Sequence, residues 1–264
     1  MTGMGFDGWC AEIVDQAELM AKHLAGADLL SPVPSCPGWT TAQLARHLGA
    51  GHRWAEEIVR TRAEAPLPDT ELRELSGHTD GDPEVVGSWL VAGATRLADT
   101  LRAAGPDTRV WTPIPGRADA AFYARRFAHE TLVHRADAAL ALGVPFDAAE
   151  AVVVDALDEW MELDSLPVML EIRPERRELF GPGRTLHLHA TDTAPGVGAE
   201  WLVDLTGEVG SWRRAHEKAA VAVRGPLTEL LLTVYGRRSP ADGTVEVLGD
   251  RALLDLWLAR VSFG

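Results

Sequence analysis

Apolar residues in the first half of the chain recur at spacings of three and four positions, and alternation with a period of two is almost absent there. This spacing places the apolar side chains on one face of an α-helix. The pattern predicts five helices separated by loops, over residues 9–29, 41–62, 83–104, 119–142 and 148–163. Long helices joined in this way are typical of an up-and-down bundle.

Two of these helices carry clear boundary signals. Thr40 is a good N-cap, and Gln43 three residues later completes the pattern of a capping box. Gly143, with Pro145 just beyond it, predicts the end of the fourth helix.

The pattern changes after Pro167, where short apolar or alternating runs are separated by glycine and proline. These runs predict strands at 168–170, 185–190, 201–205, 219–223 and 244–248, and helices at 226–235 and 250–260. We therefore expect a two-domain α+β protein, with a helical domain over residues 1–165 and a small α+β domain over residues 166–264.

Charge and composition exclude several classes of protein. The 25 Lys and Arg residues against 39 Asp and Glu give a net charge of -14, which disfavours nucleic acid and anionic membranes as partners. Residues 1–9 lack the features of a secretory signal, and no apolar run is long enough for a membrane span. Two cysteines are too few for a disulfide framework. We expect a cytoplasmic protein.

The candidate chemistry lies in the fourth helix. Glu130 and His134 are four residues apart, so their side chains project from one helix face and can meet one metal ion. His129 is five residues from His134 and points elsewhere.

A third ligand must come from another helix, and His47 lies on the apolar stripe of the second helix. Two histidines and one carboxylate form a three-ligand site with a vacant position, as expected of catalytic zinc. The alternative is that each histidine is a hydrogen-bonded core residue. His52 is five residues from His47, so we expect it at the bundle surface or in contact with a ligand residue.

Other polar pairs are open to two interpretations. Asp137 and Arg135 can orient the ligands or form a surface pair. His187 and His189 share one face of a predicted strand at a spacing that can chelate a metal, but no third ligand is evident. We expect these two histidines to face solvent.

Several motifs resemble those of one known family. They are Ser-Cys-Pro-Gly-Trp-Thr at 35–40, Leu-x-x-His-Leu at 44–48, His-Glu-x-x-x-His-Arg-x-Asp at 129–137 and Val-Leu-Gly-Asp at 247–250. Over nearly its whole length the chain resembles the actinobacterial mycothiol-dependent maleylpyruvate isomerase family. The resemblance implies a DinB-like four-helix bundle followed by a sterol-carrier-like α+β domain.

The resemblance also implies the site and the reaction class. A divalent metal, usually zinc, would be held by His47, Glu130 and His134, and an arginine of the second domain, best matched by Arg237, would assist catalysis. The implied enzyme uses mycothiol as a thiol cosubstrate to isomerise a small unsaturated acid, or to transfer the thiol to an electrophile. No protein nucleophile is needed, and we expect Cys10 and Cys36 to lie outside the cluster.

Two other functions remain open at this point. A thiol-independent zinc hydrolase would use the vacant position to activate water. A non-enzymatic ligand-binding protein would use the metal for structure alone, although a vacant coordination position argues against it.

Overall fold

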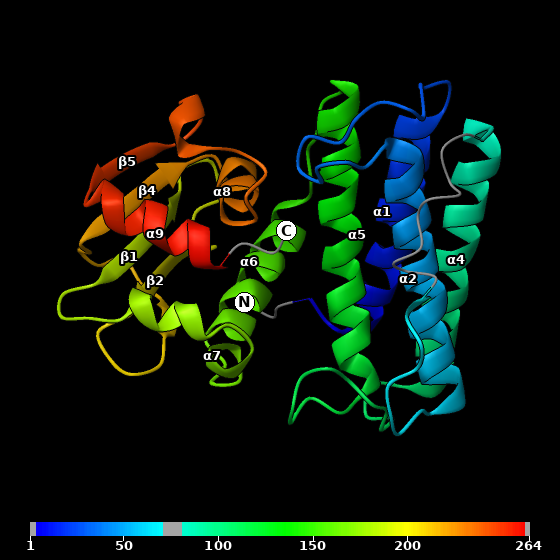
Figure 1. Ribbon diagram of the computed structural model, residues 1–264, viewed down its shortest axis with the longest axis horizontal. Coiled ribbons are helices and arrows are strands. Elements are labelled where there is room, and N and C mark those ends of the chain that lie inside the picture. The colour runs from blue at the N-terminus through cyan, green and yellow to red at the C-terminus, as the bar shows by residue number, and fades with distance from the viewer. Residues whose placement is uncertain (1–3, 71–80, 262–264) are drawn as a thin grey trace. The chain divides into compact units, whose positions relative to one another are not determined.

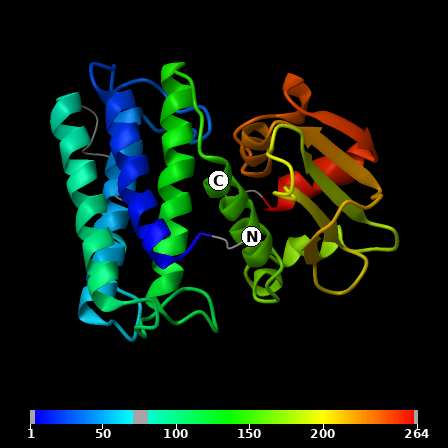
Figure 2. The same ribbon diagram turned by 180° about the vertical axis from the view of Figure 1, so that it is seen from behind.

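The computed structural model describes residues 4–70 and 81–261, which form two compact units. One unit ends at Phe146 and the other begins at Asp147. Figures 1 and 2 show the first as a group of helices running side by side and the second as a sheet with helices. The predicted order, a helical region followed by a small mixed-sheet region, is confirmed.

The described part of the helical unit contains four long helices, and α1 and α2 each pack against both α4 and α5. Their bounds are α1 (Phe6–Leu24), α2 (Thr41–Thr61), α4 (Pro83–Ala104) and α5 (Ala120–Leu142). The predicted apolar stripes meet in the centre, where residues such as Ile13, Leu48 and Leu97 are fully or almost fully buried. α1 ends five residues before the predicted position, because the chain turns at Gly26, whose φ is 69°.

The capping box predicted for α2 is confirmed. The backbone N–H of Gln43 donates to Thr40 Oγ1 at 3.3 Å, and the backbone N–H of Thr40 donates to Gln43 Oε1 at 2.9 Å. This cap fixes the register at which α2 begins.

A glycine sets the close approach of α2 and α4. A Cβ at Gly49 would lie 2.2 Å from the Trp89 ring, so no other residue fits without moving that ring. The guanidinium of Arg53, one turn along α2, lies 3.8 Å from the centroid of the same ring. The Trp89 ring therefore packs between Gly49 and Arg53, and these contacts hold α2 and α4 close together.

The second unit is built on a five-stranded sheet with the order β3-β2-β1-β4-β5. The strands are β1 (Thr185–Ala190), β2 (Glu200–Asp204), β3 (Ser211–Arg214), β4 (Val221–Gly225) and β5 (Glu246–Gly249). Only β1 and β4 are parallel among these pairs. The helical elements are α6 (Glu150–Asp164), α7 (Met169–Ile172), η1 (Pro174–Leu179), α8 (Leu227–Val234), η2 (Pro240–Asp242) and α9 (Arg251–Val261).

Two predictions for this unit were wrong. The segment 168–170 is not a strand but enters the short helix α7, in which the consecutive residues Met169 and Leu170 are both buried. β3 was missed because its residues are mainly polar and partly exposed, so the segment lacks the apolar signal of a strand.

The units divide before α6, whereas the sequence placed this helix in the first domain. Helix α6 belongs to the second unit because its side chains form hydrogen bonds and a salt bridge with residues of the sheet. Asp158 accepts a hydrogen bond from Trp201 Nε1 at 2.8 Å and pairs with Arg214, whose Nη2 lies 2.7 Å away. Helix α6 also packs on α8.

Across the described residues, every helix is too short or too polar to traverse a lipid bilayer.

Candidate metal centre

Helix α5 holds two of the predicted ligands one turn apart. His134 Nε2 lies 3.2 Å from Glu130 Oε1, and His134 is only 7% exposed. The other carboxylate oxygen of Glu130 accepts from Arg126 Nη2 at 3.3 Å. The predicted pair therefore forms, with an arginine beside its carboxylate.

Helix α2 brings the third predicted residue to the same place. The rings of His47 and His134 meet edge to face with centroids 5.4 Å apart. One ligand atom each of His47, Glu130 and His134 lies within 4.8 Å of the others. We name these three residues the helical cluster.

The ring of Trp39 packs edge to face on His47 with centroids 4.9 Å apart. Trp39 lies just before α2, in the loop that the capping box ends. This loop therefore helps to orient one member of the helical cluster.

A buried carboxylate lies behind His134. Asp137 is fully buried, and its Oδ2 lies 2.9 Å from His134 Nδ1. Ser35 Oγ donates to Asp137 Oδ1 at 2.6 Å. The bond to Nδ1 fixes the ring of His134 with its Nε2 toward Glu130, which is the usual way a carboxylate orients a metal-binding histidine.

The surface-pair alternative for Asp137 and Arg135 was wrong. Arg135 is 2% exposed; its Nε donates to Gln16 Oε1 at 2.5 Å, and its guanidinium lies 4.4 Å from the centroid of the Phe146 ring. The two residues have separate buried roles. The signal for Asp137 was present in the sequence, since residues three apart on a helix are neighbours.

The expectation that both cysteines lie outside the cluster was wrong for Cys36. Its sulfur is 3.8 Å from Asp137 Oδ2, and Cys36, His134 and Asp137 form a second group of ligand-type atoms. The loop before α2 places Cys36 there, and periodicity carries no information on loop conformation. Cys10 is buried in α1.

Hydrogen bonding controls the charge of this site. Burial lowers the pKa of His134, but its hydrogen bonds to Asp137 and Glu130 outweigh burial and raise the pKa to about 9. Burial raises the pKa of Glu130, yet the neighbouring His134, Arg126 and His47 hold that pKa well below its ordinary value. A metal ion that binds His134 must therefore displace a proton held between two carboxylates.

The donor set of the helical cluster suits zinc, which takes imidazole nitrogen and carboxylate oxygen and keeps a fourth position open in catalytic sites. The group around Cys36 suits it less well. That group would use His134 Nδ1, which is bonded to Asp137, and both oxygens of Asp137 already have partners. The helical cluster is therefore the better fit.

His52 and His129 lie apart from the helical cluster. His52 is fully buried, so the expected surface position was wrong; its Nε2 lies 2.9 Å from Thr131 Oγ1. The Thr131 hydroxyl donates to the Phe127 carbonyl, so His52 is the donor in this pair. Burial lowers its pKa to about 3, which keeps the ring neutral. His129 is also buried.

Arg237, the arginine implied by the resemblance, lies in the second unit, as do the nearby arginines Arg224 and Arg238. Arg237 Nη1 donates to the carbonyl of Tyr235 at 2.7 Å, just past the end of α8. Arg224 lies 3.8 Å from Glu246, and Arg238 lies 3.8 Å from Glu229. All three thus have local partners.

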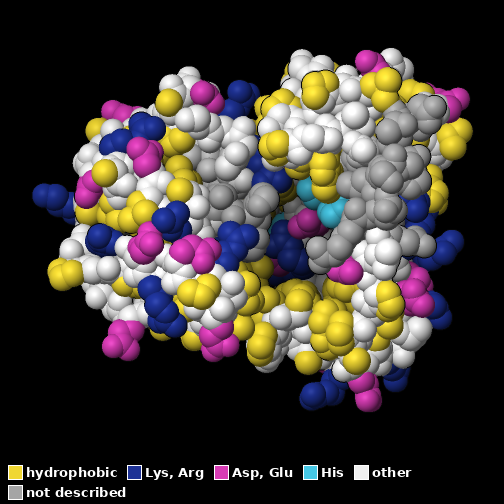
Figure 3. Space-filling view, in the orientation of Figure 1, with side chains coloured by type: hydrophobic (Ala, Val, Ile, Leu, Met, Phe, Trp, Pro, Cys, Tyr) yellow, Lys and Arg dark blue, Asp and Glu magenta, His cyan; other side chains and the backbone are white. Residues whose placement is uncertain are grey.

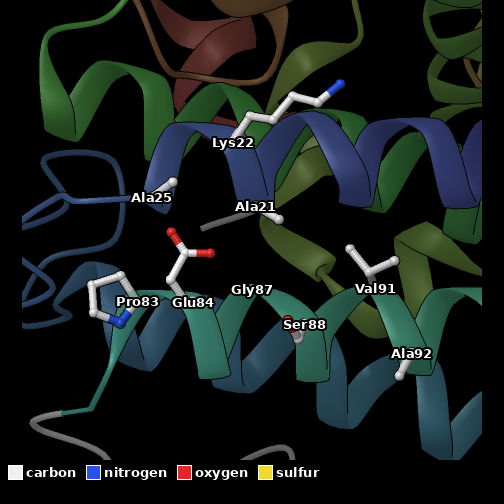
Figure 4. Close-up of a pocket in the computed structure, with 9 residues that line it drawn as sticks. All are labelled: Ala21, Lys22, Ala25, Pro83, Glu84, Gly87, Ser88, Val91 and Ala92. Carbon is white, nitrogen blue, oxygen red and sulfur yellow. The ribbon is translucent and has the colours of Figure 1, made fainter.

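The surface offers two further observations. In Figure 3, histidine side chains of the helical unit are visible next to acidic and basic side chains. A groove of about 460 Å³ lies elsewhere, between α1 and α4, lined by residues such as Ala21, Glu84 and Val91 (Figure 4). None of its lining residues belongs to the helical cluster.

Comparison with known proteins identifies both units. Residues 10–139 match the family described as the mycothiol maleylpyruvate isomerase N-terminal domain, and residues 143–256 match the MDMPI C-terminal domain. None of the curated proteins compared matches the chain.

Solved structures agree with this assignment in fold. A mycothiol-dependent maleylpyruvate isomerase matches with a TM-score of 0.62 and 16% identity, covering 94% of this chain and 95% of the other. A mutant form of such an isomerase matches with a TM-score of 0.61 at 16% identity and the same coverage. With two family domains spanning most of its residues, the chain belongs to the mycothiol-dependent maleylpyruvate isomerase family of enzymes.

Proposed function

We propose that this protein is a metal-dependent enzyme that uses a low-molecular-weight thiol, mycothiol, to isomerise a small unsaturated acid or to transfer the thiol to an electrophile. One observation carries the proposal. In a chain of this family, one ligand atom each of His47, Glu130 and His134 lies within 4.8 Å of the others, and Asp137 is hydrogen-bonded to the ring of His134. The family relationship supports the thiol, and the ligand geometry supports the metal.

A divalent metal, zinc by its ligands, would favour the thiolate form of a thiol at neutral pH. The chain's own residues do the rest. Asp137 keeps a proton on His134 Nδ1 and leaves Nε2 free to act as a ligand. Arg126 holds the Glu130 carboxylate in its charged form, which is the form that binds cations.

The isomerisation we propose needs no group on the protein to form a covalent bond. The thiol sulfur adds to one carbon of a cis double bond, rotation follows about the single bond so formed, and elimination of the thiol gives the trans product. In the transfer reaction the adduct is released instead.

We also propose that Arg237 binds a carboxylate of the substrate or the thiol. An arginine fork matches a carboxylate with two parallel hydrogen bonds. The bond from Nη1 to the Tyr235 carbonyl restricts the side chain and holds the guanidinium at the end of α8. A cytoplasmic location, and the lack of nucleic-acid and membrane partners, stay predictions from charge and composition.

The test is the conversion of small unsaturated acids and other electrophiles by zinc-loaded protein, with and without mycothiol, from about pH 6 to about pH 9. We expect activity only with the thiol, and a rate that is flat with pH until the metal ligands take up protons. Full activity without any thiol, rising through about pH 7, would instead establish the hydrolase.

A thermal shift with a panel of cellular thiols gives an independent measurement. Selective stabilisation by one thiol supports the proposal, because only a ligand of the folded state raises the melting temperature. Equal responses to all thiols, or none, would count against it.

A further inference from the structure

Four ligand-type side chains of the second unit converge on one point. His187 and His189 lie on β1, Glu200 lies opposite His189 on β2, and His216 follows β3. One ligand atom from each of the four lies within 4.8 Å of the others. We name these residues the sheet cluster.

The expectation that both strand histidines face solvent was wrong for His187, which is 6% exposed. Its side chain is the most buried of the sheet cluster, whereas that of His216 is 75% exposed. The missing third ligand escaped the sequence analysis because it comes from the pairing of β1 with β2 and from the segment after β3. Spacing along one strand says nothing of either.

Three imidazoles face a single carboxylate oxygen. Glu200 Oε2 lies 2.9 Å from His187 Nε2, 3.0 Å from His189 Nδ1 and 2.6 Å from His216 Nδ1. The three rings are mutually close, with centroids 5.6 to 5.8 Å apart. One nitrogen of each ring is thus directed at the same oxygen of Glu200.

Hydrogen bonding alone accounts poorly for this arrangement. A carboxylate oxygen accepts about two hydrogen bonds, so a third N–H directed at the same oxygen has no lone pair of its own. A cation at the centre removes the conflict, since all four atoms then act as ligands. In a tetrahedral zinc site, ligand atoms lie about 3.3 Å apart, which is slightly more than the distances from Glu200 Oε2 to the three ring nitrogens.

We propose that the sheet cluster is a second metal site, holding one divalent transition-metal ion of the zinc class through His187, His189, Glu200 and His216. Three imidazoles and one oxygen exclude magnesium and calcium, which need mostly oxygen ligands. Four protein ligands leave no open position, so this ion is structural. It joins β1, β2 and the segment after β3, and His216 is its most exposed ligand.

The test uses the full chain, stripped with a chelator, dialysed against Zn²⁺ and analysed for metal. The variants are His189→Ala/His216→Ala for the sheet cluster and His47→Ala for the helical cluster. Glu217→Gln is the matched control, because Glu217 is exposed, adjacent to His216 and paired with Arg213. Loading with Co²⁺ gives a second readout, since its visible spectrum reports tetrahedral coordination.

We expect two metal equivalents in the unmodified chain and in Glu217→Gln, and one in each of the other variants. The tetrahedral Co²⁺ signal of the sheet cluster should disappear in His189→Ala/His216→Ala and persist in His47→Ala. Suppose that the unmodified chain binds one metal equivalent, which His189→Ala/His216→Ala retains and His47→Ala loses. This result would overturn the proposal of a second site and leave the proposed function intact. One equivalent that His47→Ala retains and His189→Ala/His216→Ala loses would support the sheet cluster and contradict the metal site of the proposed function.

His216→Ala alone guards against a folding defect. Its side chain is 75% exposed, so its removal leaves the packing of the sheet unchanged. We expect weaker zinc binding and a smaller rise in melting temperature on adding Zn²⁺ than in the unmodified chain. The same rise in both proteins would contradict the site.

Discussion

The helical cluster and the sheet cluster bring similar side chains together on different scaffolds. In the helical cluster, two ligands follow from the repeat of one helix, a third comes from a neighbouring helix, and a buried carboxylate orients one of them. In the sheet cluster, four ligands come from adjacent segments of the sheet unit. Three protein ligands leave room for an outside molecule, whereas four close the shell. On our two proposals, the number of protein ligands, more than their residue type, separates a site for chemistry from a structural metal site.

The largest effect should come from replacing His134, which contacts both carboxylates of its site. His134→Ala should remove the metal of the helical cluster and lower thiol-dependent turnover by more than about 100-fold, since loss of an orienting contact alone costs 10- to 100-fold. Metal analysis and turnover check this outcome. His216→Ala, its counterpart in the sheet cluster, should retain turnover. A full equivalent of zinc retained by the helical unit of His134→Ala would remove His134 from the ligands.

The helical cluster could be predicted because two of its members lie one turn apart on one helix, so that only the meeting of α2 with α5 is a long-range feature. Glu130 and His134 are four residues apart on a strongly predicted helix, and His47 lies on an apolar stripe that must face the bundle core. These two facts do not depend on how the chain folds at long range. The contact of Asp137 with His134 has the same local origin, and only its burial had to come from the structure.

The remaining features depend on long-range pairing. Glu200 meets His189 through the register of β1 and β2, and a shift of one residue would turn either side chain to the other face. Cys36 reaches Asp137 through a loop without any periodicity. The predicted strand 168–170, whose last two residues belong to α7, is a short apolar run, which periodicity cannot assign to helix or strand.

Asp137→Asn tests whether the buried carboxylate distinguishes the helical cluster from the sheet cluster. The amide keeps the shape of the side chain but loses the charge that holds the proton on His134 Nδ1. We expect a loss of about 10- to 100-fold in metal affinity at the helical cluster, measured by competition with a chelator. Ser35→Ala, which removes only the hydroxyl bonded to Asp137, should have a smaller effect. Equal affinities in all three proteins would show that Asp137 has no positioning role.

Arg237→Lys tests whether the sheet unit contributes to the reaction beyond its proposed structural metal. Lysine keeps the charge but not the two-pronged donor, so kcat/KM should fall about tenfold. The melting temperature should hardly change, because a lysine can still donate to the Tyr235 carbonyl. An unchanged kcat/KM would refute the role of Arg237.

The metal-free protein should show the charge state of the helical cluster through its stability. The pKa of His134 is about 9 in the folded protein, above the value of about 6.5 for an unperturbed histidine. Its contribution to the free energy of unfolding is therefore complete below about pH 6.5 and disappears as the pH rises through about 9. We expect a decline of about 3 kcal/mol across this range in denaturant unfolding, at about 1.4 kcal/mol for each pH unit between the two pKa values.

Asp137→Asn should reduce this decline, because it removes one of the bonds that raise the pKa. Zinc affinity should change in the opposite direction and increase with pH, since binding requires His134 without its Nε2 proton. A stability that is level between about pH 6.5 and about pH 9 would argue against a protonated His134.

The smallest effect is expected at Cys36, whose thiol forms a group of ligand-type atoms with His134 and Asp137. In our proposal the reacting sulfur belongs to the added thiol, and Cys36 lies beside the site with its sulfur 3.8 Å from Asp137 Oδ2. Cys36→Ser keeps a donor at this position, so thiol-dependent turnover and metal content should both stay within about twofold of the unmodified protein, as replacements that preserve a weak contact usually do. Loss of turnover with the metal retained would make Cys36 the nucleophile, and loss of the metal would assign the ion to the group of Cys36, His134 and Asp137 instead.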